Sequence, residues 1–224
     1  MELTGGRTID KQAFLFDMDG VIIDSEPIHF AVDMETMEHF GYVVTKEQFE
    51  KYVGMTNPEM WADVKREFGL SHSVDEIIEY QLARKIDIIR HEAFEPIAGI
   101  RSLIAELKQR DFAIGLASSS PRVFIEAVLT RFEMLGIFDC IVSGEEVPRG
   151  KPAPDVYLEA AKQLGVDSHS CVVLEDARHG VAAAKAAGMK CIGYMNPNSG
   201  EQDLSQADWI IRDMKEISLD ELFN

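Results

Sequence analysis

Short apolar runs alternate with helical patterns from residue 96 onward, and this alternation restricts the fold more than any other feature of the sequence. The runs are too short for amphipathic helices, so we expect strands at 112–117, 138–142, 171–174, 191–194 and 209–211. The segments before or between these runs predict helices at 100–110, 121–132, 154–164 and 177–187. Strands that alternate with helices of about ten residues indicate right-handed crossovers and a parallel sheet with helices on both faces.

One more buried strand is expected at 12–16, but the stretch from 26 to 94 has only helical patterns. Its signals for the beginning of a helix are Pro27, the capping pair Thr45 and Gln48, Asn57 followed by Pro58, and the capping pair Ser73 and Glu76. We therefore predict an α/β fold whose core, a Rossmann-like parallel sheet, is formed by 1–25 and 95–224. An all-helical cap domain, 26–94, is inserted after the first strand.

The chain of 224 residues has a formal net charge of −17, which excludes some classes of partner. A strongly negative surface repels phosphate polymers and anionic membranes, so we expect neither nucleic acid nor a membrane as a partner. The three cysteines border or lie within apolar runs, form no CxxC pair, and are expected to be reduced core thiols. Because no apolar run approaches the length of a membrane span and no targeting segment is recognised, we expect a cytoplasmic protein.

The first apolar run ends in two carboxylates, Asp17 and Asp19. Ligands of open parallel sheets bind beyond the carboxyl ends of the strands, and ionised carboxylates leave water only beside positive charge. The polar residues expected at the same edge are Ser118, Lys151, Glu175 and Asp176. Acids that converge with a lysine predict Mg²⁺ and a phosphate group, because Mg²⁺ prefers oxygen ligands and leaves positions for substrate oxygens. The helix that starts at Pro121 adds free N–H groups that favour an anion.

Each of these residues also has an ordinary structural explanation. Asp19 before a glycine is typical of a turn, Lys151 of a solvated loop, and acids before a helix favour its dipole. Their joint position at consecutive strand ends is what favours a site. Other motifs do not fit, because an EF-hand would require glycine in place of Ile22 and glutamate in place of Ile28. The segment 144–151 is one residue too long for a P-loop.

Four segments of the chain resemble the motifs of the haloacid dehalogenase-like hydrolase superfamily. They are DMDGVIIDSEP at 17–27, LASSS at 116–120, GKPAPDVY at 150–157 and LEDARHG at 174–180. They occur in the order of that family and span nearly the whole core. The helical insertion is similar to the cap of the branch that holds β-phosphoglucomutase and sugar-phosphate phosphatases. The resemblance implies a Mg²⁺-dependent hydrolase of a small phosphorylated metabolite.

The resemblance also implies a role for each matching residue. Asp17 would be the nucleophile that forms an aspartyl-phosphate, and Asp19 the general acid and base. Phosphate binding would involve Met18, Asp19, Ser118, Ser119 and Lys151. Mg²⁺ would be bound by Asp17, the Asp19 carbonyl and Asp176, with Glu175 in support. Because dehalogenases of the superfamily lack the second aspartate, Asp19 favours phosphoryl transfer over cleavage of a carbon–halogen bond.

The substrate depends on the helical insertion. His29 matches the cap-hinge histidine of β-phosphoglucomutase, Lys85 its cap lysine, and the loop with Thr56 and Asn57 resembles the loop that meets the substrate. His29 and Lys85 could equally be ordinary residues of a helix surface. In the mutase an arginine that grips a second phosphate stands where this chain has Asn57, which favours a phosphatase acting on a sugar phosphate. A sugar phosphomutase and a non-catalytic phosphometabolite binder are the alternatives, and the intact set of acids argues against the binder.

Overall fold

The computed structural model describes residues 11–45, 48–49 and 57–222. Contacts within the chain divide it into two compact units. One consists of Met1–Asp24 and Glu95–Asn224, and the other of Ser25–Phe94. We refer to them as the α/β unit and the helical unit.

Six parallel strands form the sheet of the α/β unit, in the order β3-β2-β1-β4-β5-β6. The strands are β1 (Ala13–Phe16), β2 (Ala113–Ser118), β3 (Cys140–Ser143), β4 (Cys171–Glu175), β5 (Lys190–Tyr194) and β6 (Trp209–Ile211). Every expected strand is present, with ends that differ from the sequence-based ranges by no more than two residues. The sheet winds outward from β1 in both directions, so β1 with its neighbours β2 and β4 forms the switch point at which such sheets bind ligands.

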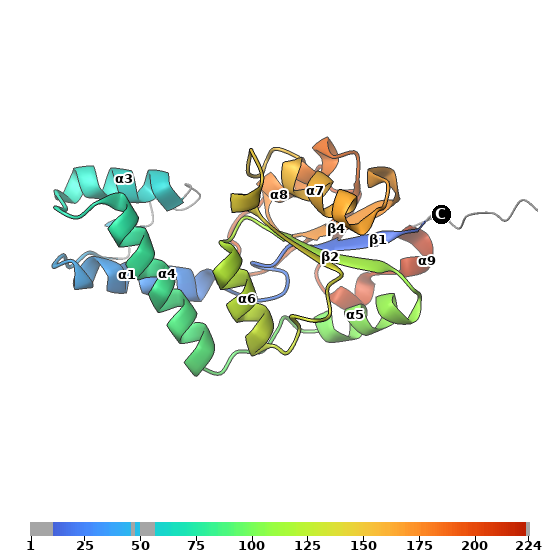
Figure 1. Cartoon of the computed structure of the whole chain (residues 1–224), viewed down its shortest axis with the longest axis horizontal. Coiled ribbons are helices and arrows are strands. Elements are labelled where there is room, and N and C mark those ends of the chain that lie inside the picture. Colours follow the sequence, from blue (N-terminus) through green and yellow to red (C-terminus); the bar gives the residue numbers. More distant parts are fainter. Residues whose placement is uncertain (1–10, 46–47, 50–56, 223–224) are drawn as a thin grey trace, which may run out of the picture. The chain divides into compact units, whose positions relative to one another are not determined.

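Helices cover both faces of this sheet (Figure 1). They are α5 (Ile100–Gln109), α6 (Arg122–Arg131), α7 (Asp155–Leu164), α8 (Arg178–Ala186) and α9 (Leu219–Leu222). In Figure 1, α7 and α8 lie on one side of β1, β2 and β4, and α5 and α9 lie on the other. The sequence did not predict α9 or the 3₁₀ turns η1 (Gly144–Glu146), η2 (Ser168–Ser170) and η3 (Met214–Glu216), because three or four residues are too few for a periodic pattern.

The core of the α/β unit explains the uninterrupted apolar sequence of β1. All four of its residues are buried, since paired strands flank it and helices cover the sheet. Leu15 belongs to a buried cluster with Val173 of β4, Ala160 of α7 and Ala184 of α8. Small alanine side chains on both helices allow close packing against the strands. This packing fixes the carboxyl ends of the central strands.

The helical unit contains α1 (Glu26–His39), α3 (Asn57–Phe68) and α4 (Val74–His91). Its apolar side chains enclose a separate core of Met37, Val44, Phe49, Met60, Trp61, Val64, Leu70 and Ile77. The Trp61 side chain is fully buried there. In the described residues, this unit therefore has a core made only from its own segments.

Both expected capping pairs in this unit form their reciprocal hydrogen bonds. Ser73 Oγ accepts a hydrogen bond from the backbone N–H of Glu76 at 3.2 Å, and Glu76 Oε2 accepts one from the N–H of Ser73 at 2.8 Å. Thr45 and Gln48 form the same reciprocal pair at 3.4 and 2.8 Å. The interpretation of Asn57 as a cap is wrong, because Asn57 is the first residue inside α3 and its side-chain amide donates to Gln81.

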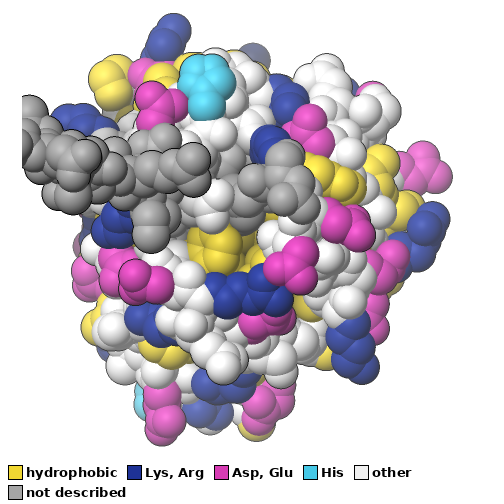
Figure 2. Space-filling model, turned by 90° about the vertical axis from the view of Figure 1, so that its right-hand side faces the viewer, with side chains coloured by type: hydrophobic (Ala, Val, Ile, Leu, Met, Phe, Trp, Pro, Cys, Tyr) yellow, Lys and Arg dark blue, Asp and Glu magenta, His cyan; other side chains and the backbone are white. Residues whose placement is uncertain are grey.

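The surface of the molecule carries charges of both signs. On the face drawn in Figure 2, Lys and Arg side chains are scattered among acidic and uncharged ones rather than gathered in one basic patch, as far as the described residues show. No helix among the described residues has the length and apolar character needed to cross a membrane.

Candidate active site

A tight turn follows β1 and carries the first two acids. The backbone N–H of Asp17 still pairs with the Leu174 carbonyl at 3.0 Å, which keeps Asp17 in line with the sheet. The Met18 carbonyl then accepts from the N–H groups of Ile22 and Ile23 at 2.8 and 3.1 Å, and the chain turns back. Gly20 has a φ of +74°, and a Cβ there would lie 1.9 Å from Asp176 Oδ2. Only glycine allows the turn and the Asp176 carboxylate to approach this closely.

Lys151 links the ends of three strands. Its ammonium group donates to Asp17 Oδ1 and to Glu175 Oε1, both at 2.6 Å, and to the Ala117 carbonyl of β2 at 3.2 Å. Only 7% of the Lys151 side chain is exposed. A buried ammonium requires such partners, so Lys151 belongs to the site and is not the solvated loop residue of the alternative interpretation.

Glu175 holds this lysine in a fixed position. Its Oε1 also accepts from the Tyr157 hydroxyl at 2.7 Å, and its Oε2 accepts from the backbone N–H groups of Asp176 and Ala177 at 3.1 Å each. A Cβ at Gly180 would lie 1.6 Å from Glu175 Oε1, so α8 can pass the carboxylate only with glycine at this position. Glu175 is thus an anchored anion. Tyr157 was not expected in the site, although it stands in the GKPAPDVY motif.

The loop after β5 supports Asp176 and the turn after β1. The Ser199 hydroxyl donates to Asp176 Oδ2, and the Asn196 side-chain amide donates to the Gly20 carbonyl at 2.9 Å. The sequence analysis missed both residues. The signal that could have identified them is the polar segment 196–199 directly beyond the carboxyl end of a strand, the same kind of position that identified Asp17 and Ser118.

Burial and crowding of like charges raise the pKa values of the acids. For Asp17, burial raises the pKa most, Lys151 opposes it, and the charges of Glu175, Asp176 and Asp19 raise it further. For Asp176, burial and the Glu175 charge raise the pKa to about 7, against the Ser199 hydrogen bond. Burial lowers the pKa of Lys151, but Asp17 and Glu175 outweigh this and raise it. The site therefore contains more negative charge than Lys151 balances.

Three of the acids fit a hard metal ion. Asp17, Glu175 and Asp176 each offer a carboxylate oxygen, and these oxygens lie within 4.8 Å of one another. The surplus of negative charge that raises the pKa values of Asp17 and Asp176 is the charge that a divalent cation would neutralise. Oxygen donors are the ligands of Mg²⁺ or Ca²⁺ rather than of softer metals.

The Asp19 carboxylate contacts two serine hydroxyls. Its Oδ2 accepts from the Ser120 hydroxyl at 2.7 Å and from the Ser118 hydroxyl at 3.4 Å. Among the described residues, the Asp19 carboxylate is not part of the cluster of metal-ligating acids, so only its backbone could join that cluster. Ser120 was not expected in the site.

The two remaining residues assigned to phosphate differ in exposure. The Met18 side chain is fully buried in the core, so only its backbone can reach a phosphate oxygen. Ser119 is exposed, and its Cα would lie 3.1 Å from a Cβ on Gly144, which places the loop after β2 directly against the loop after β3.

In the helical unit, a polar network connects three of the four expected substrate residues. The Asn57 amide donates to Gln81 Oε1 at 2.8 Å, and Gln81 Nε2 donates to Asp33 Oδ1. Lys85 Nζ lies 4.0 Å from the same Asp33 oxygen, and the charge of His29 also acts on Asp33. Thr56 lies outside the described residues. Asp33 and Gln81, which hold the network together, were missed because residues 48 positions apart in the sequence gave no sign of their contact.

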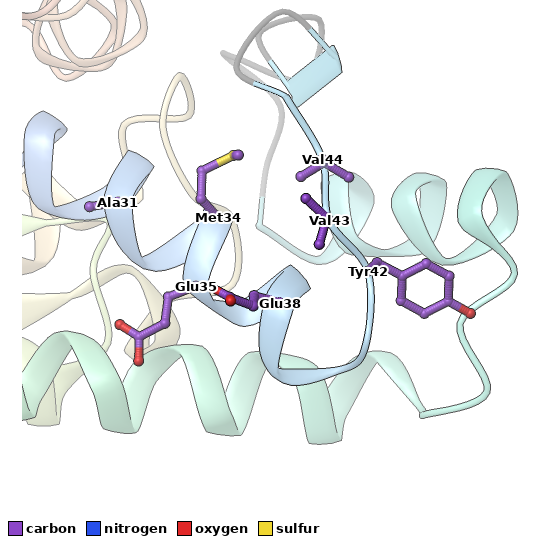
Figure 3. A pocket seen from close by; sticks show the side chains of 7 residues that line it. All are labelled: Ala31, Met34, Glu35, Glu38, Tyr42, Val43 and Val44. Atoms are coloured by element: carbon purple, nitrogen blue, oxygen red, sulfur yellow. The ribbon is translucent and has the colours of Figure 1, made fainter.

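A hollow of about 330 Å³ also lies in the helical unit. Figure 3 shows its lining, which consists of Ala31, Met34, Glu35, Glu38, Tyr42, Val43 and Val44. The two charged residues of this lining are both acidic, so the hollow has no group that attracts a phosphate. The chemistry suggested by the sequence is found at the sheet edge of the α/β unit.

Comparisons with known proteins agree with this geometry. The family model described as haloacid dehalogenase-like hydrolase matches residues 14–194. The chain is 35% identical to hexitol phosphatase B of Escherichia coli strain K12 over 94% of this chain and 93% of that protein. The crystal structure of CbbY from Rhodobacter sphaeroides in complex with phosphate matches with a TM-score of 0.84 and 26% identity, over 95% of this chain and 99% of that one. A putative beta-phosphoglucomutase from Thermotoga maritima matches with a TM-score of 0.76 and 27% identity, over 92% and 95%.

Proposed function

Because the chain belongs to the haloacid dehalogenase-like hydrolase family, we propose that it is a Mg²⁺-dependent phosphatase that hydrolyses a small sugar phosphate. The observation that carries the proposal is the buried Lys151 ammonium, which contacts both Asp17 and Glu175 where β1, β2 and β4 end. One cation among several acids and hydroxyls suits a phosphoryl group, whose transfer requires positioning and neutralisation of charge.

Asp17 is assigned the role of nucleophile. One of its carboxylate oxygens attacks phosphorus, the bond between phosphorus and the leaving oxygen breaks, and an aspartyl-phosphate forms. Lys151 holds Asp17 in position and contributes positive charge beside the transferred group, together with Ser118. Water then attacks the same phosphorus, which releases inorganic phosphate and restores the Asp17 carboxylate.

Asp19 is assigned the role of proton carrier in both halves of the reaction. In the first half it donates its proton to the oxygen of the departing alcohol. In the second half it takes a proton from the attacking water, which returns Asp19 to the acid form. General acid and base catalysis of this kind contributes roughly 10²- to 10⁴-fold in rate.

Mg²⁺ would be held by Asp17 and Asp176, with Glu175 nearby, and would supply charge that neutralises phosphoryl oxygens. Hard oxygen donors and the raised pKa values of Asp17 and Asp176 support this choice of ion. The role of Glu175 is mainly to fix Lys151, because Glu175 accepts four hydrogen bonds from protein donors.

The choice of a phosphatase over a phosphomutase depends on the helical unit, which we assign the role of a cap. A mutase needs a cation that grips a second phosphate, and the corresponding Asn57 is an uncharged amide bonded to Gln81. We keep His29, Thr56, Asn57 and Lys85 as the proposed substrate residues of the cap. The name of one relative, hexitol phosphatase B, favours a small polyhydroxy monophosphate as substrate. The three free, buried cysteines favour a cytoplasmic location.

The deciding experiment is a panel of sugar and polyol phosphates incubated with the protein and Mg²⁺. Released phosphate and isomerised sugar phosphate are measured in the same reactions. We expect release of phosphate from at least one monophosphate and no isomer. Formation of an isomer that a bisphosphate stimulates, with little released phosphate, would overturn the phosphatase in favour of the mutase.

A further inference from the structure

Ser120 is one of the residues of the site to which the resemblance gives no role. It stands between β2 and α6, directly before the N-cap residue Pro121. Its hydroxyl donates to Asp19 Oδ2 at 2.7 Å, a shorter contact than the 3.4 Å between the Ser118 hydroxyl and the same oxygen. Ser120 therefore makes the closer of the two serine contacts to the proposed proton carrier.

Ser120 is itself fixed by two backbone contacts. Its N–H donates to Ser118 Oγ at 3.0 Å, and its carbonyl accepts from Ser143 Oγ at 2.7 Å. Ser143 is fully buried and pairs with Ser118 in the sheet register. The Ser120 hydroxyl is thus held by the ends of β2 and β3, and it can fix the direction of the Asp19 carboxylate.

A serine hydroxyl can hold one oxygen of a carboxylate and leave the direction of the other oxygen fixed. The Ser120 hydroxyl can donate to Oδ2 in both states of the acid, because Oδ2 stays an acceptor when the proton is on Oδ1. Ser118 is assigned to the phosphoryl group, so substrate would compete with Asp19 for its hydroxyl. Ser120 could keep its contact with Asp19 throughout the cycle.

We propose that Ser120 is a positioning residue, which holds Asp19 Oδ2 so that the opposite oxygen, Oδ1, faces the leaving oxygen and delivers the proton. This inference rests on the proposed phosphatase function. Oδ1 donates the proton to the departing alcohol in the first half of the reaction and takes one from water in the second.

The test uses the dependence of the rate on the leaving group. Asp19 matters most when the leaving alcohol is a poor one, as in a sugar phosphate, and least for p-nitrophenyl phosphate, whose phenol leaves as a stable anion. The ratio kcat/KM covers the steps up to release of the alcohol. For Ser120→Ala we expect a loss of about tenfold in kcat/KM on a sugar phosphate and of less than about threefold on p-nitrophenyl phosphate.

Two variants separate positioning from a general loss of structure. Ser120→Thr retains a hydroxyl, and we expect it to restore the sugar-phosphate kcat/KM to within about threefold of the parent value. Ser205→Ala removes an exposed hydroxyl far along the chain and should leave both substrates unaffected. Circular dichroism of the four proteins provides the check on folding.

The outcomes distinguish the inference from the function on which it rests. If the parent is active and Ser120→Ala lowers kcat/KM by the same factor on both substrates, or leaves both unchanged, the positioning role is overturned. The proposed phosphatase function is then unaffected. If the parent hydrolyses neither substrate with Mg²⁺, the proposed function fails and the role of Ser120 fails with it.

Discussion

Each unit contains an aspartate with a largely buried side chain beside a lysine, and the two pairs differ in their surroundings. In the α/β unit, Asp17 Oδ1 lies 2.6 Å from Lys151 Nζ, and in the helical unit, Asp33 Oδ1 lies 4.0 Å from Lys85 Nζ. All four side chains are largely buried. Burial is the main cause that raises the pKa of both aspartates. By these criteria alone, the two pairs would be judged alike.

The two pairs differ in the charged groups that surround each aspartate. Glu175, Asp176 and Asp19 all raise the pKa of Asp17 further, against Lys151 alone. For Asp33, the neighbours Lys85, Gln81 and His29 all lower the pKa. The network around Asp33 is balanced by its own groups, whereas the site around Asp17 has a surplus of negative charge that a cation must complete. This surplus distinguishes a candidate catalytic centre from a polar network within a fold.

The largest expected effect comes from matched changes of the two aspartates. Asp17→Asn removes the proposed nucleophile and should lower kcat by about 10⁴-fold or more, because an amide cannot form the aspartyl-phosphate. Asp33→Asn keeps an acceptor for Gln81 and should lower kcat by less than about tenfold. Phosphate release from a sugar phosphate under saturating Mg²⁺ measures both. An Asp17→Asn protein as active as the parent would remove Asp17 from its role.

The lysines should differ in their contribution to stability. Lys151→Met leaves Asp17 and Glu175 buried without their cation, and loss of one partner of a buried pair costs about 3–5 kcal/mol. Lys85→Met should cost about 1 kcal/mol, since Lys85 is 4.0 Å from Asp33 and Gln81 still donates to that carboxylate. Urea unfolding with a chelator present, at slightly alkaline pH, gives both free energies. Equal losses would mean that surplus charge does not distinguish the sites.

The third prediction concerns pH and metal. Asp176 has a pKa of about 7 in the metal-free fold and about 3.9 in an unfolded chain, so between these values the folded state binds more protons. The stability of the metal-free protein should therefore decrease as the pH rises from about 4 to about 7. The raised pKa of Asp17 should also make the stability decrease as the pH rises.

Mg²⁺ should reverse this decrease, because it binds the ionised carboxylates of the folded state. We expect the increase in melting temperature on addition of Mg²⁺ to be larger above about pH 7 than near pH 5, and to disappear in Asp176→Asn. Melting curves with Mg²⁺ and with a chelator at each pH test this. An increase of the same size at both pH values would contradict the assignment of the metal ligands.

The sequence predicted the sheet and most of the residues at its edge, because both depend on local patterns. The structure confirmed every predicted strand and, in the α/β unit, every helix that is longer than four residues. The match to the family model confirmed the family. Asp17, Ser118 and Asp176 could be predicted because they directly follow or end buried strands, and Asp19 because it stands in the turn after the first strand. Their catalytic roles, and those of the cap residues, stay predictions.

The supporting groups could not be predicted, because their contacts join distant segments. Asn196 donates to Gly20 from 176 positions away, and Ser120 reaches Asp19 from 101 positions away. Such polar residues look like ordinary loop residues until the sheet brings the loops together. The different surroundings of the acids could not be predicted either. Nothing in the sequence indicates that Ser120 contacts Asp19 while Asp17 and Asp176 lie together at the proposed metal position.

The smallest expected effect comes from a matched pair of tyrosine hydroxyls. The Tyr157 hydroxyl donates to buried Glu175 at 2.7 Å, and the Tyr42 hydroxyl donates to the Gly69 carbonyl at 3.1 Å in an exposed position. Tyr157→Phe should lower the free energy of unfolding by about 1.5–3 kcal/mol, because the lost bond leads to a charged group, and Tyr42→Phe by less than about 1 kcal/mol. Both are measured by urea unfolding.

The activity of Tyr157→Phe separates a purely structural contact from one that supports the site. Glu175 positions Lys151, so a loosened Glu175 should lower kcat a few-fold while KM for the sugar phosphate changes little. Tyr42→Phe has no such connection to Lys151 and should leave kcat unchanged. If Tyr157→Phe lowers stability and leaves kcat at the parent value, Lys151 is held well enough by Asp17 and the Ala117 carbonyl, and Glu175 serves the fold more than the reaction.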